Sequence, residues 1–258
     1  MLVLAVGLLS SGSSWGPPAS SSPRFVYSLL EGPRDSFWEA APGSLPGRRL
    51  AEVPHREGYG VRARVSPDGR SVAYNVWPAG GPPELRVLSL ATAETLRLAA
   101  GIDLPSPPLW SHDGSRVLVR TSSPGLPRDT FQVLSIDVAA GDVSVAVPEV
   151  VADGIYLIGW LDGGLVYAVI DGGTDVFLDT GRVGHLSDGI ARDFSLSADG
   201  ALAFGEVIGQ ALRPRVVMLG GSAERALPYG RGSVYGSADP GALLAGMSGY
   251  TEFAGWLP

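Results

Sequence analysis

The sequence of 258 residues contains no cysteine and no lysine, and it contains a single asparagine, Asn75. Without cysteine the chain forms no disulfide, binds no metal through a thiolate, has no cysteine nucleophile and carries no lipid on a cysteine. All 19 basic residues are therefore arginines, and with 26 acidic residues the formal net charge is −7. No basic cluster of the kind that follows a phosphate backbone is present, which argues against a nucleic-acid partner.

Apolar runs are short as well. The run at residues 2–9 is too short to cross a bilayer as a helix, and a Ser/Gly/Pro-rich stretch of the kind that makes flexible tethers follows it. It resembles the second half of a secretion signal, although no positive charge precedes it. We therefore expect residues 1–23 to be a signal or anchor remnant, compatible with a membrane tether, and the protein to be extracytoplasmic: periplasmic, secreted or membrane-anchored. A cytoplasmic protein with an N-terminal strand and tail is the alternative.

Helical periodicity is missing too, since no segment keeps a helical period over three turns. Glycine (36 residues) and proline (21 residues) are instead abundant, and they fall between short apolar runs. Many short strands separated by turns are typical of an all-β protein.

Asp-Gly turns flanked by alternating apolar residues recur along the chain. They lie in residues 65–76 ("VSPDGRSVAYNV"), 110–121, 159–170, 196–207 and, in degraded form, 236–247. Their aspartates are 37 to 49 residues apart, which is the period of a four-stranded propeller blade: Asp68, Asp113, Asp162, Asp199 and Asp239. Asp-Gly favours a tight hairpin, so Asp68, Asp113 and Asp199 are predicted to shape turns and not to carry chemistry.

The turn segments "VSPDG" at residues 65–69 and "WSHDG" at residues 110–114 resemble TolB-like repeats. This resemblance implies an all-β domain over residues 24–258, a β-propeller of four-stranded antiparallel blades. The same repeat occurs in a periplasmic Tol-Pal protein, in the propeller domains of prolyl-oligopeptidase-like enzymes and in many exported proteins. It therefore implies a fold and not an activity.

The blade count depends on the two ends of the domain. Residues 24–53 look like the last three strands of one blade, and residues 232–258 look like the first strands of another. We predict six blades, with strands shared between the termini so that both ends lie in one sheet. Five blades are expected instead if the C-terminal strand completes the N-terminal blade, and an incompletely closed ring is a further alternative.

No set of residues forms a coherent catalytic or metal-binding motif, and we predict no cofactor and no metal site. The histidines are far apart in the sequence: His55, His112 and His185. Ser248 in "GMSGY" resembles a nucleophile elbow, but no histidine follows it. Three carboxylates in "DGGTDVFLD" are better explained by a solvated interstrand loop than by a calcium loop: Asp171, Asp175 and Asp179.

Two tryptophans, Trp110 and Trp160, occupy the same position in successive repeats, directly before the turn. A large aromatic side chain at this position is expected to pack between neighbouring blades. Trp77, in the loop "WPAGGPP", is the best candidate for an exposed aromatic contact with a partner.

Charged residues precede the turn motif on two of the predicted innermost strands, where a propeller's central channel opens. These are Arg62, Arg64, Arg192 and Asp193. If the channel mouth is a binding site, these side chains are expected to bind an anionic group or a protein side chain. The alternative is that they only hydrate a water-filled channel.

The repeat and the missing catalytic set favour a non-enzymatic binding or scaffold module for a protein partner. The alternative is a propeller hydrolase or lyase whose carboxylates, from different blades, converge at the channel mouth. A third interpretation is a propeller subunit of a larger assembly. The sequence leaves the oligomeric state open.

Overall fold

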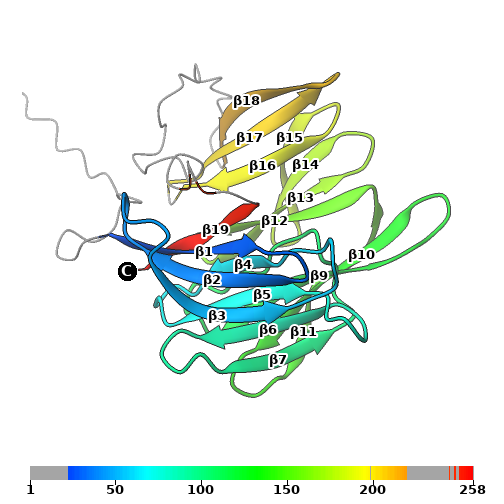
Figure 1. The fold of residues 1–258 in the computed structure, drawn as a ribbon. Helices are drawn as coiled ribbons and strands as arrows, with labels where there is room; N and C mark the ends of the chain where they lie inside the picture. The colour runs from blue at the N-terminus through cyan, green and yellow to red at the C-terminus, as the bar shows by residue number, and fades with distance from the viewer. Residues whose placement is uncertain (1–22, 198, 220–243, 245–246, 248–249, 258) are drawn as a thin grey trace, which may run out of the picture.

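The computed structural model describes residues 23–197, 199–219, 244, 247 and 250–257. All regular secondary structure in these residues is β, arranged in five antiparallel sheets (Figure 1). Residues 1–22, most of the degraded fifth repeat and Ser248 lie outside the described residues. The described part of the chain contains no helix long and apolar enough to span a bilayer.

Each sheet is a blade, whose strands follow one another from the innermost outward. Blade A contains β19 (Thr251–Leu257), β1 (Arg24–Leu30), β2 (Arg34–Ala40) and β3 (Arg48–Pro54). Blade B contains β4 (Arg62–Val65), β5 (Ser71–Val76), β6 (Glu84–Ser89) and β7 (Thr95–Ala100). Blade C contains β8 (Leu109–Trp110), β9 (Arg116–Ser123), β10 (Asp129–Asp137) and β11 (Val143–Ala152). Blade D contains β12 (Gly154–Leu161), β13 (Gly164–Ile170), β14 (Thr174–Leu178) and β15 (Gly181–Ser187). Blade E contains β16 (Ala191–Leu196), β17 (Ala201–Ile208) and β18 (Ala211–Met218).

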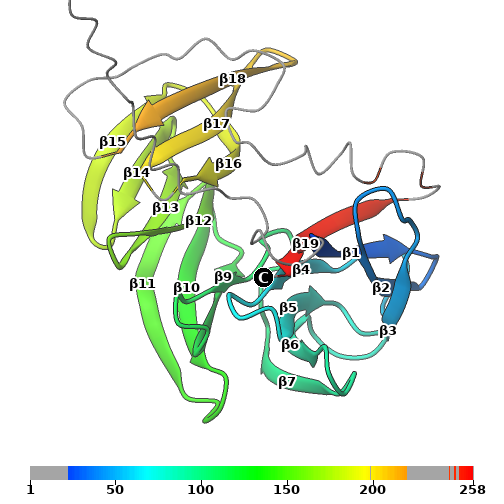
Figure 2. The same cartoon turned by 90° about the vertical axis from the view of Figure 1, so that its left-hand side faces the viewer.

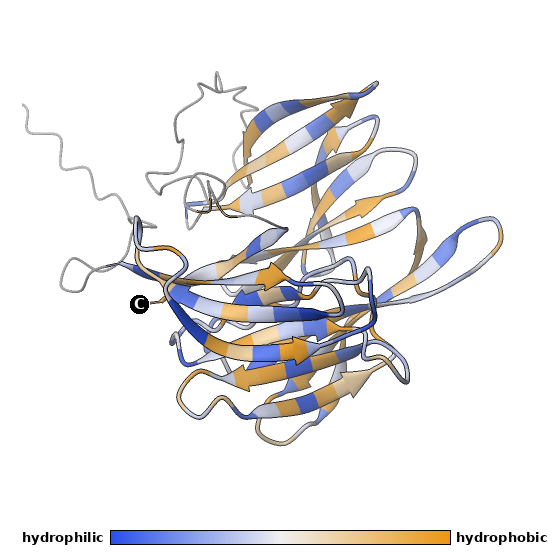
Figure 3. Ribbon diagram, viewed as in Figure 1, coloured by the Kyte–Doolittle hydropathy of each residue, from blue (hydrophilic) through white to orange (hydrophobic). Residues whose placement is uncertain are grey.

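Hydrophobic cores lie between consecutive blades, and alternate residues of one strand enter different cores. All seven residues of β13 are buried. Tyr167 packs in the core between blades C and D, whereas its neighbours Val166 and Ala168 pack in the core between blades D and E. This two-sided burial follows from the period of two in a strand placed between two sheets. A strand buried on both faces, such as β13, is therefore apolar throughout, whereas along other strands hydrophobic and hydrophilic residues are interspersed (Figure 3).

The Asp-Gly turns are built as the sequence predicts. In the first copy, the hydroxyl of Ser66 donates to Asp68 (2.6 Å) and also accepts from the amide of Ser71 (2.9 Å). Gly69 has a φ of 67°, which glycine adopts without strain. In the third copy, Asp162 (φ 50°) and Gly163 (φ 83°) form a two-residue hairpin loop with both φ values positive. These aspartates shape the backbone.

The prediction of six blades is wrong, because the described residues form five. Residues 251–257, assigned from the sequence to a separate final blade, form β19, which pairs with β1 from Arg24↔Leu257 to Leu29↔Thr251. The C-terminal strand thus completes the N-terminal blade, as the five-blade alternative expects. The prediction that both ends of the domain lie in one sheet is confirmed.

The blades form an arc (Figure 2). Separate cores join blades A and B, B and C, C and D, and D and E. Among the described residues, no core cluster joins blade E to blade A. The face of blade A turned away from blade B instead carries an aromatic cluster with Phe25 and Tyr27, against which Leu244 and Met247 pack.

The innermost strands are also linked by tryptophan indoles. Trp110 on β8 is 6% exposed, and its Nε1 donates to the carbonyl oxygen of Arg64 on β4 (2.9 Å). Trp160 on β12 donates in the same way to the carbonyl oxygen of Trp110 (2.7 Å). The prediction that both tryptophans pack between blades is confirmed, and each also joins its blade to the preceding one.

Candidate functional site

Two predicted site residues, Arg62 and Arg64, lie on β4, the innermost strand of blade B. Strand alternation places Val61 and Ala63, each 1% exposed, in the core between blades A and B. The arginine side chains therefore point away from that core, at the place where β4 lies beside β19. We call this place the β4–β19 mouth and define it by Arg62, Arg64, Tyr250 and Glu252.

Arg62 is paired with a residue that is distant in the sequence. Its Nη1 contacts the carboxylate of Glu252 on β19, and it also donates to the hydroxyl of Tyr250 (3.1 Å). Its guanidinium lies 5.8 Å from the centre of the Tyr250 ring. Burial opposes the charge of Arg62, but Glu252 and Tyr250 raise its pKa above the ordinary value. Burial raises the pKa of Glu252, and Arg62 and Arg64 oppose that rise.

Arg64 is the less neutralised of the two arginines. Its Nη1 donates to the carbonyl oxygen of Ala63 (2.9 Å) and lies 4.0 Å from the nearer oxygen of Glu252. Burial lowers its pKa, Glu252 opposes this decrease, and the like charge of Arg62 adds to it. Solvent nevertheless reaches 44% of the side chain, as expected of a guanidinium that projects into an opening walled by protein. Such a cation is suited to bind an incoming anion.

A buried histidine–aspartate pair lies behind the mouth. Nε2 of His55 is 3.1 Å from Oδ2 of Asp35, and both side chains are almost completely buried. His55 Nδ1 lies 2.8 Å from the carbonyl oxygen of Arg56, and since a carbonyl only accepts, Nδ1 carries a proton. The same Asp35 oxygen accepts from the amide of Val61 (2.8 Å). Burial raises the pKa of Asp35, and the amide of Val61, the neighbouring His55 and the charge of Arg62 oppose the rise.

The other two charged residues predicted at the channel, Arg192 and Asp193, lie on β16 of blade E. Both are exposed, and their side chains approach to 3.7 Å. The pairing of β16 with β17 shifts between Arg192 and Ser195, and Asp193 within this bulge has a φ of 58°. Among the described residues, Arg192 and Asp193 pair with each other and not with the β4–β19 mouth. The structure therefore does not bring all four predicted residues into one cluster.

Trp77 follows β5 and lies between its own loop and the segment that connects blade A to blade B. The guanidinium of Arg56 stacks on its ring at 4.6 Å, and the ring of Tyr59 is also 4.6 Å away. Its Nε1 donates to the carbonyl oxygen of Gly81 (3.1 Å). These contacts give Trp77 a local structural role, and its contact with a partner stays a prediction.

The three carboxylates considered as a calcium loop have separate partners. Asp171 pairs with Arg128, Asp175 binds Arg182 (2.8 Å) and His185 (2.7 Å), and Asp179 accepts from the amide of Leu165 (2.9 Å). Within the part of the chain that is described, no group of three acidic, histidine or cysteine residues is arranged to hold a metal ion.

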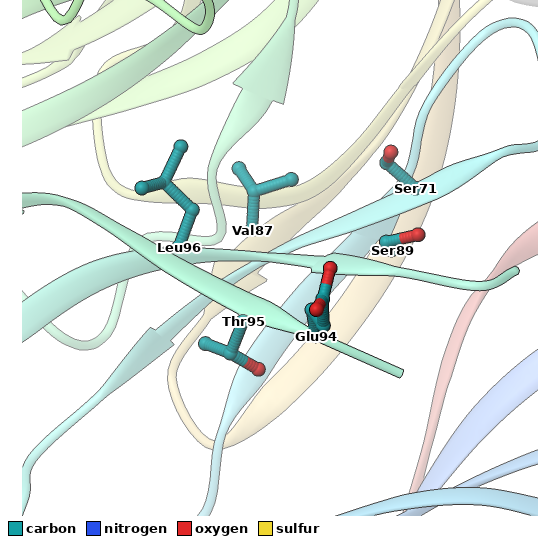
Figure 4. Close-up of a pocket in the computed structure, with 6 residues that line it drawn as sticks. All are labelled: Ser71, Val87, Ser89, Glu94, Thr95 and Leu96. Atoms are coloured by element: carbon teal, nitrogen blue, oxygen red, sulfur yellow. The ribbon is translucent and has the colours of Figure 1, made fainter. Parts of the chain in front are cut away.

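A hollow of about 570 Å³ opens to solvent on blade B (Figure 4). Its lining is mixed, with hydroxyl groups, one carboxylate and two aliphatic side chains: Ser71, Val87, Ser89, Glu94, Thr95 and Leu96. Ser71 begins β5, whereas Asn75 near the end of β5 pairs with Arg62. The hollow therefore lies over the outer strands β6 and β7 and the Ser71 end of β5, whereas Arg62 of the β4–β19 mouth is on the innermost strand, opposite the far end of β5.

Sequence reasoning did not find four residues around the mouth: Asp35, His55, Tyr250 and Glu252. Glu252 lies 190 residues from Arg62 along the chain, so no local motif connects them. The available signal was weak: "GYTEF" places an acidic residue in an otherwise uncharged final segment.

These features define a β-propeller: β1 pairs with β19 in one sheet, the sheets are arranged as blades, and hydrophobic cores lie between consecutive blades. No family model matches the chain, and no curated protein matches it. Among solved structures the fold is similar to TolB from Acinetobacter baumannii, with a TM-score of 0.60 and 15% identity, covering 77% of this chain and 51% of that chain. A putative TolB from Agrobacterium tumefaciens has a TM-score of 0.50 and 15% identity, covering 77% of this chain and 86% of that chain.

A propeller from an enzyme is similar as well. The β-propeller domain of the Trilobed protease from Pyrococcus furiosus, described as having an open velcro topology, has a TM-score of 0.53 and 12% identity. The match covers 81% of this chain and 67% of that chain. This chain spans about half the length of the Acinetobacter TolB. At these sequence identities the likeness shows the fold alone. The resemblance of the repeats to TolB-like repeats is confirmed as a similarity of fold.

Proposed function

We propose that this chain is a non-enzymatic propeller module that binds a protein partner outside the cytoplasm, with the β4–β19 mouth as its binding surface. The observation that carries the proposal is Arg64, a cation that is walled by protein, incompletely neutralised and still reached by solvent. A carboxylate of the partner would complete its charge pairing. Charge-assisted, two-pronged hydrogen bonds make arginine the usual residue for such recognition.

The rigid surroundings of Arg64 support the same interpretation. Its carbonyl oxygen is held by the indole of Trp110, and Arg62 beside it is fixed by Glu252 and Tyr250. A side chain on a backbone that is already ordered loses less conformational entropy when a ligand binds. The mouth is thus preorganised for binding.

The alternative enzyme hypothesis requires carboxylates from different blades to face one pocket. The two carboxylates whose pKa is raised by burial, Asp35 and Glu252, both belong to blade A. Asp35 is bound by Val61 and His55, and Glu252 is bound by Arg62. Both are engaged within the protein, so they give no support to a hydrolase or lyase.

The test cross-links the full chain to proteins of the exported fraction and identifies the proteins that it captures. Three forms of the chain are compared: wild type, Arg64→Gln and Arg70→Gln. Arg70 is a matched control, because its side chain is 85% exposed in the turn after β4. We expect at least one protein that wild type and Arg70→Gln capture equally and that Arg64→Gln captures about tenfold less, a ratio that corresponds to one lost charged hydrogen bond. Identical capture by Arg64→Gln would rule out the mouth as the binding surface.

The location is tested separately by sequencing the N-terminus of the native protein after cell fractionation. Export predicts a mature N-terminus near Ser20, after the apolar run and its tether. Intact Met1 on cytosolic protein would contradict export without affecting the mouth.

A further inference from the structure

Two aromatic side chains are exposed among the described residues, and both lie next to Arg62. Tyr59 is 43% exposed and Tyr250 is 54% exposed, whereas every other described phenylalanine, tyrosine and tryptophan is buried or half-buried. The hydroxyl of Tyr250 accepts from Nη1 of Arg62 (3.1 Å), and Tyr59 precedes Arg62 by three residues. Exposed tyrosines beside arginines have the composition of a binding hot spot.

The segment that leads into β4 runs beside the end of β5 and connects these tyrosines to Trp77. The amide of Arg56 donates to the carbonyl oxygen of Trp77 (2.7 Å), and Arg62 is opposite Asn75 on β5. The ring of Tyr59 lies 4.6 Å from the ring of Trp77. Arg56, Tyr59 and Trp77 therefore adjoin the β4–β19 mouth. We call these three residues together with the mouth the extended mouth.

The extended mouth carries positive charge that the described residues do not fully neutralise. The guanidinium of Arg56 stacks on an indole ring and makes no ion pair with any described residue. Arg64 lies 4.0 Å from the nearer oxygen of Glu252, which is already bound by Arg62. Three arginines and two glutamates, Glu57 and Glu252, are present here, whereas the whole chain has a net charge of −7. The local charge is therefore complementary to an acidic group.

The aromatic side chains of the extended mouth are held in place before any partner binds. Nε1 of Trp77 donates to the carbonyl oxygen of Gly81 (3.1 Å), and Arg56 stacks on the indole ring at 4.6 Å. Tyr59 packs against this fixed ring and still exposes 43% of its surface. Tyrosine and tryptophan offer a large apolar contact area at a low cost in conformational entropy. Tyr59 is thus suited to contact an apolar side chain.

We propose that the extended mouth binds a segment of the partner protein in which an acidic residue and an aromatic or large aliphatic residue lie within about five positions of each other. This inference rests on the proposed function and adds the chemistry of the partner. The carboxylate of the partner pairs with Arg64, and its apolar side chain packs on Tyr59. These two residues are five positions apart, so their Cα atoms are at most about 18 Å apart, which an extended segment covers in about five residues.

The experiment selects displayed random dodecapeptides on the immobilised full chain and compares wild type, Tyr59→Ser, Arg64→Gln and Val183→Ser. Val183 is the control, because it lies on β15 and its exposed fraction of 42% is close to that of Tyr59. Wild type and Val183→Ser should enrich the acidic and apolar combination about tenfold over the unselected library. Tyr59→Ser should keep the acidic preference and lose the apolar one, whereas Arg64→Gln should show the reverse.

A second measurement uses wild type alone and does not depend on any variant folding. Hydrogen exchange is compared with and without the most enriched peptide. Exchange at residues 56–60 and 77–81 should slow when the peptide is bound. Residues 90–94 follow β6 at the end away from Glu84, which is opposite Val76, so their exchange should not change.

The outcomes separate this inference from the proposed function. Enrichment of acidic peptides without an apolar preference, or an apolar preference that survives in Tyr59→Ser, overturns the inference and leaves Arg64 as the binding residue. An acidic preference that survives in Arg64→Gln counts against the proposed function as well. Wild type that enriches no peptide, or unchanged exchange at residues 56–60, overturns the inference alone, because the cross-linking test decides the proposed function independently.

Discussion

The indole nitrogen of Trp160 lies 2.7 Å from the carbonyl oxygen of Trp110, whose own indole donates to the carbonyl oxygen of Arg64. Three innermost strands, β12, β8 and β4, are thereby joined by two hydrogen bonds of the same kind. The carbonyl oxygen of Arg64, the candidate binding residue, is the last acceptor in this series of hydrogen bonds. Stability of the inner ring and the position of Arg64 are therefore coupled.

Trp160→Phe should lower the free energy of unfolding by about 2 kcal/mol, because it leaves the carbonyl of Trp110 without its donor. Trp77→Phe is the control, since it removes an indole hydrogen bond to Gly81 in an exposed loop and should cost less than about 1 kcal/mol. Urea unfolding of both variants measures the difference. Equal losses would show that the link between the blades has no special weight.

In Asp113→Asn the free energy of unfolding should change less between neutral and acidic pH than in the wild type. The hydroxyl of Ser111, followed by the amide and hydroxyl of Ser115, lowers the pKa of Asp113 to about 2. A pKa lowered in the folded state stabilises the fold above the unfolded value of about 3.9, and this contribution is lost as the pH falls towards 2. The variant should therefore be less stable than wild type at pH 7, and the difference should vanish near pH 2.

Ser111→Ala offers an independent check on the same turn, because it removes the largest cause of the lowered pKa. The urea midpoint of Ser111→Ala should therefore decrease less between pH 7 and pH 2 than the midpoint of the wild type. An unchanged pH profile in both variants would mean that the turn does not stabilise ionised Asp113.

His55→Ala should destabilise the protein by about 3 kcal/mol, because it leaves Asp35 buried without its partner. Since burial raises the pKa of Asp35, the loss should shrink at acidic pH, where the carboxyl becomes neutral. His112→Ala, at an exposed turn position, should stay within about 0.5 kcal/mol of wild type. Thermal melts of both variants at two pH values distinguish these outcomes.

Arg62→Ala should cost about 1–2 kcal/mol, because Glu252 is only 16% exposed and would keep only Arg64, whose Nη1 is 4.0 Å away. Arg24→Ala removes an arginine that is 54% exposed from Glu39, which keeps Arg48 at 2.5 Å, and should cost less than about 1 kcal/mol. Denaturant midpoints provide the comparison. If both substitutions cost the same, the contact between β4 and β19 does not hold the mouth together.

Local chemistry made much of the fold predictable from the sequence. Asp162 and Gly163 determine their turn within two residues, and the repeated tryptophans mark the same inner-strand position in two blades. Both features depend on neighbours in the sequence or on the repeat period. They were therefore visible in a single chain.

The features that were missed depend on residues distant in the sequence. The blade count was wrong because "YTEFAGWL" has the same alternation whether it opens a new blade or completes the first one. The pairing of Arg62 with Glu252 and of His55 with Asp35 follows from that closure and from the packing of blade A against blade B. No spacing within one repeat encodes them.

The pairing of β1 with β19 has a consequence for synthesis of the protein. The paired residues are separated by more than two hundred positions, so β1 leaves the ribosome long before its inner partner exists. At about 5–20 residues per second, the delay is on the order of ten seconds or more. During that time the edge of β1 and the aromatic rings of Phe25 and Tyr27 have no strand beside them. Of the five described blades, blade A is thus begun before the others and completed after them, so its inner edge stays unpaired the longest.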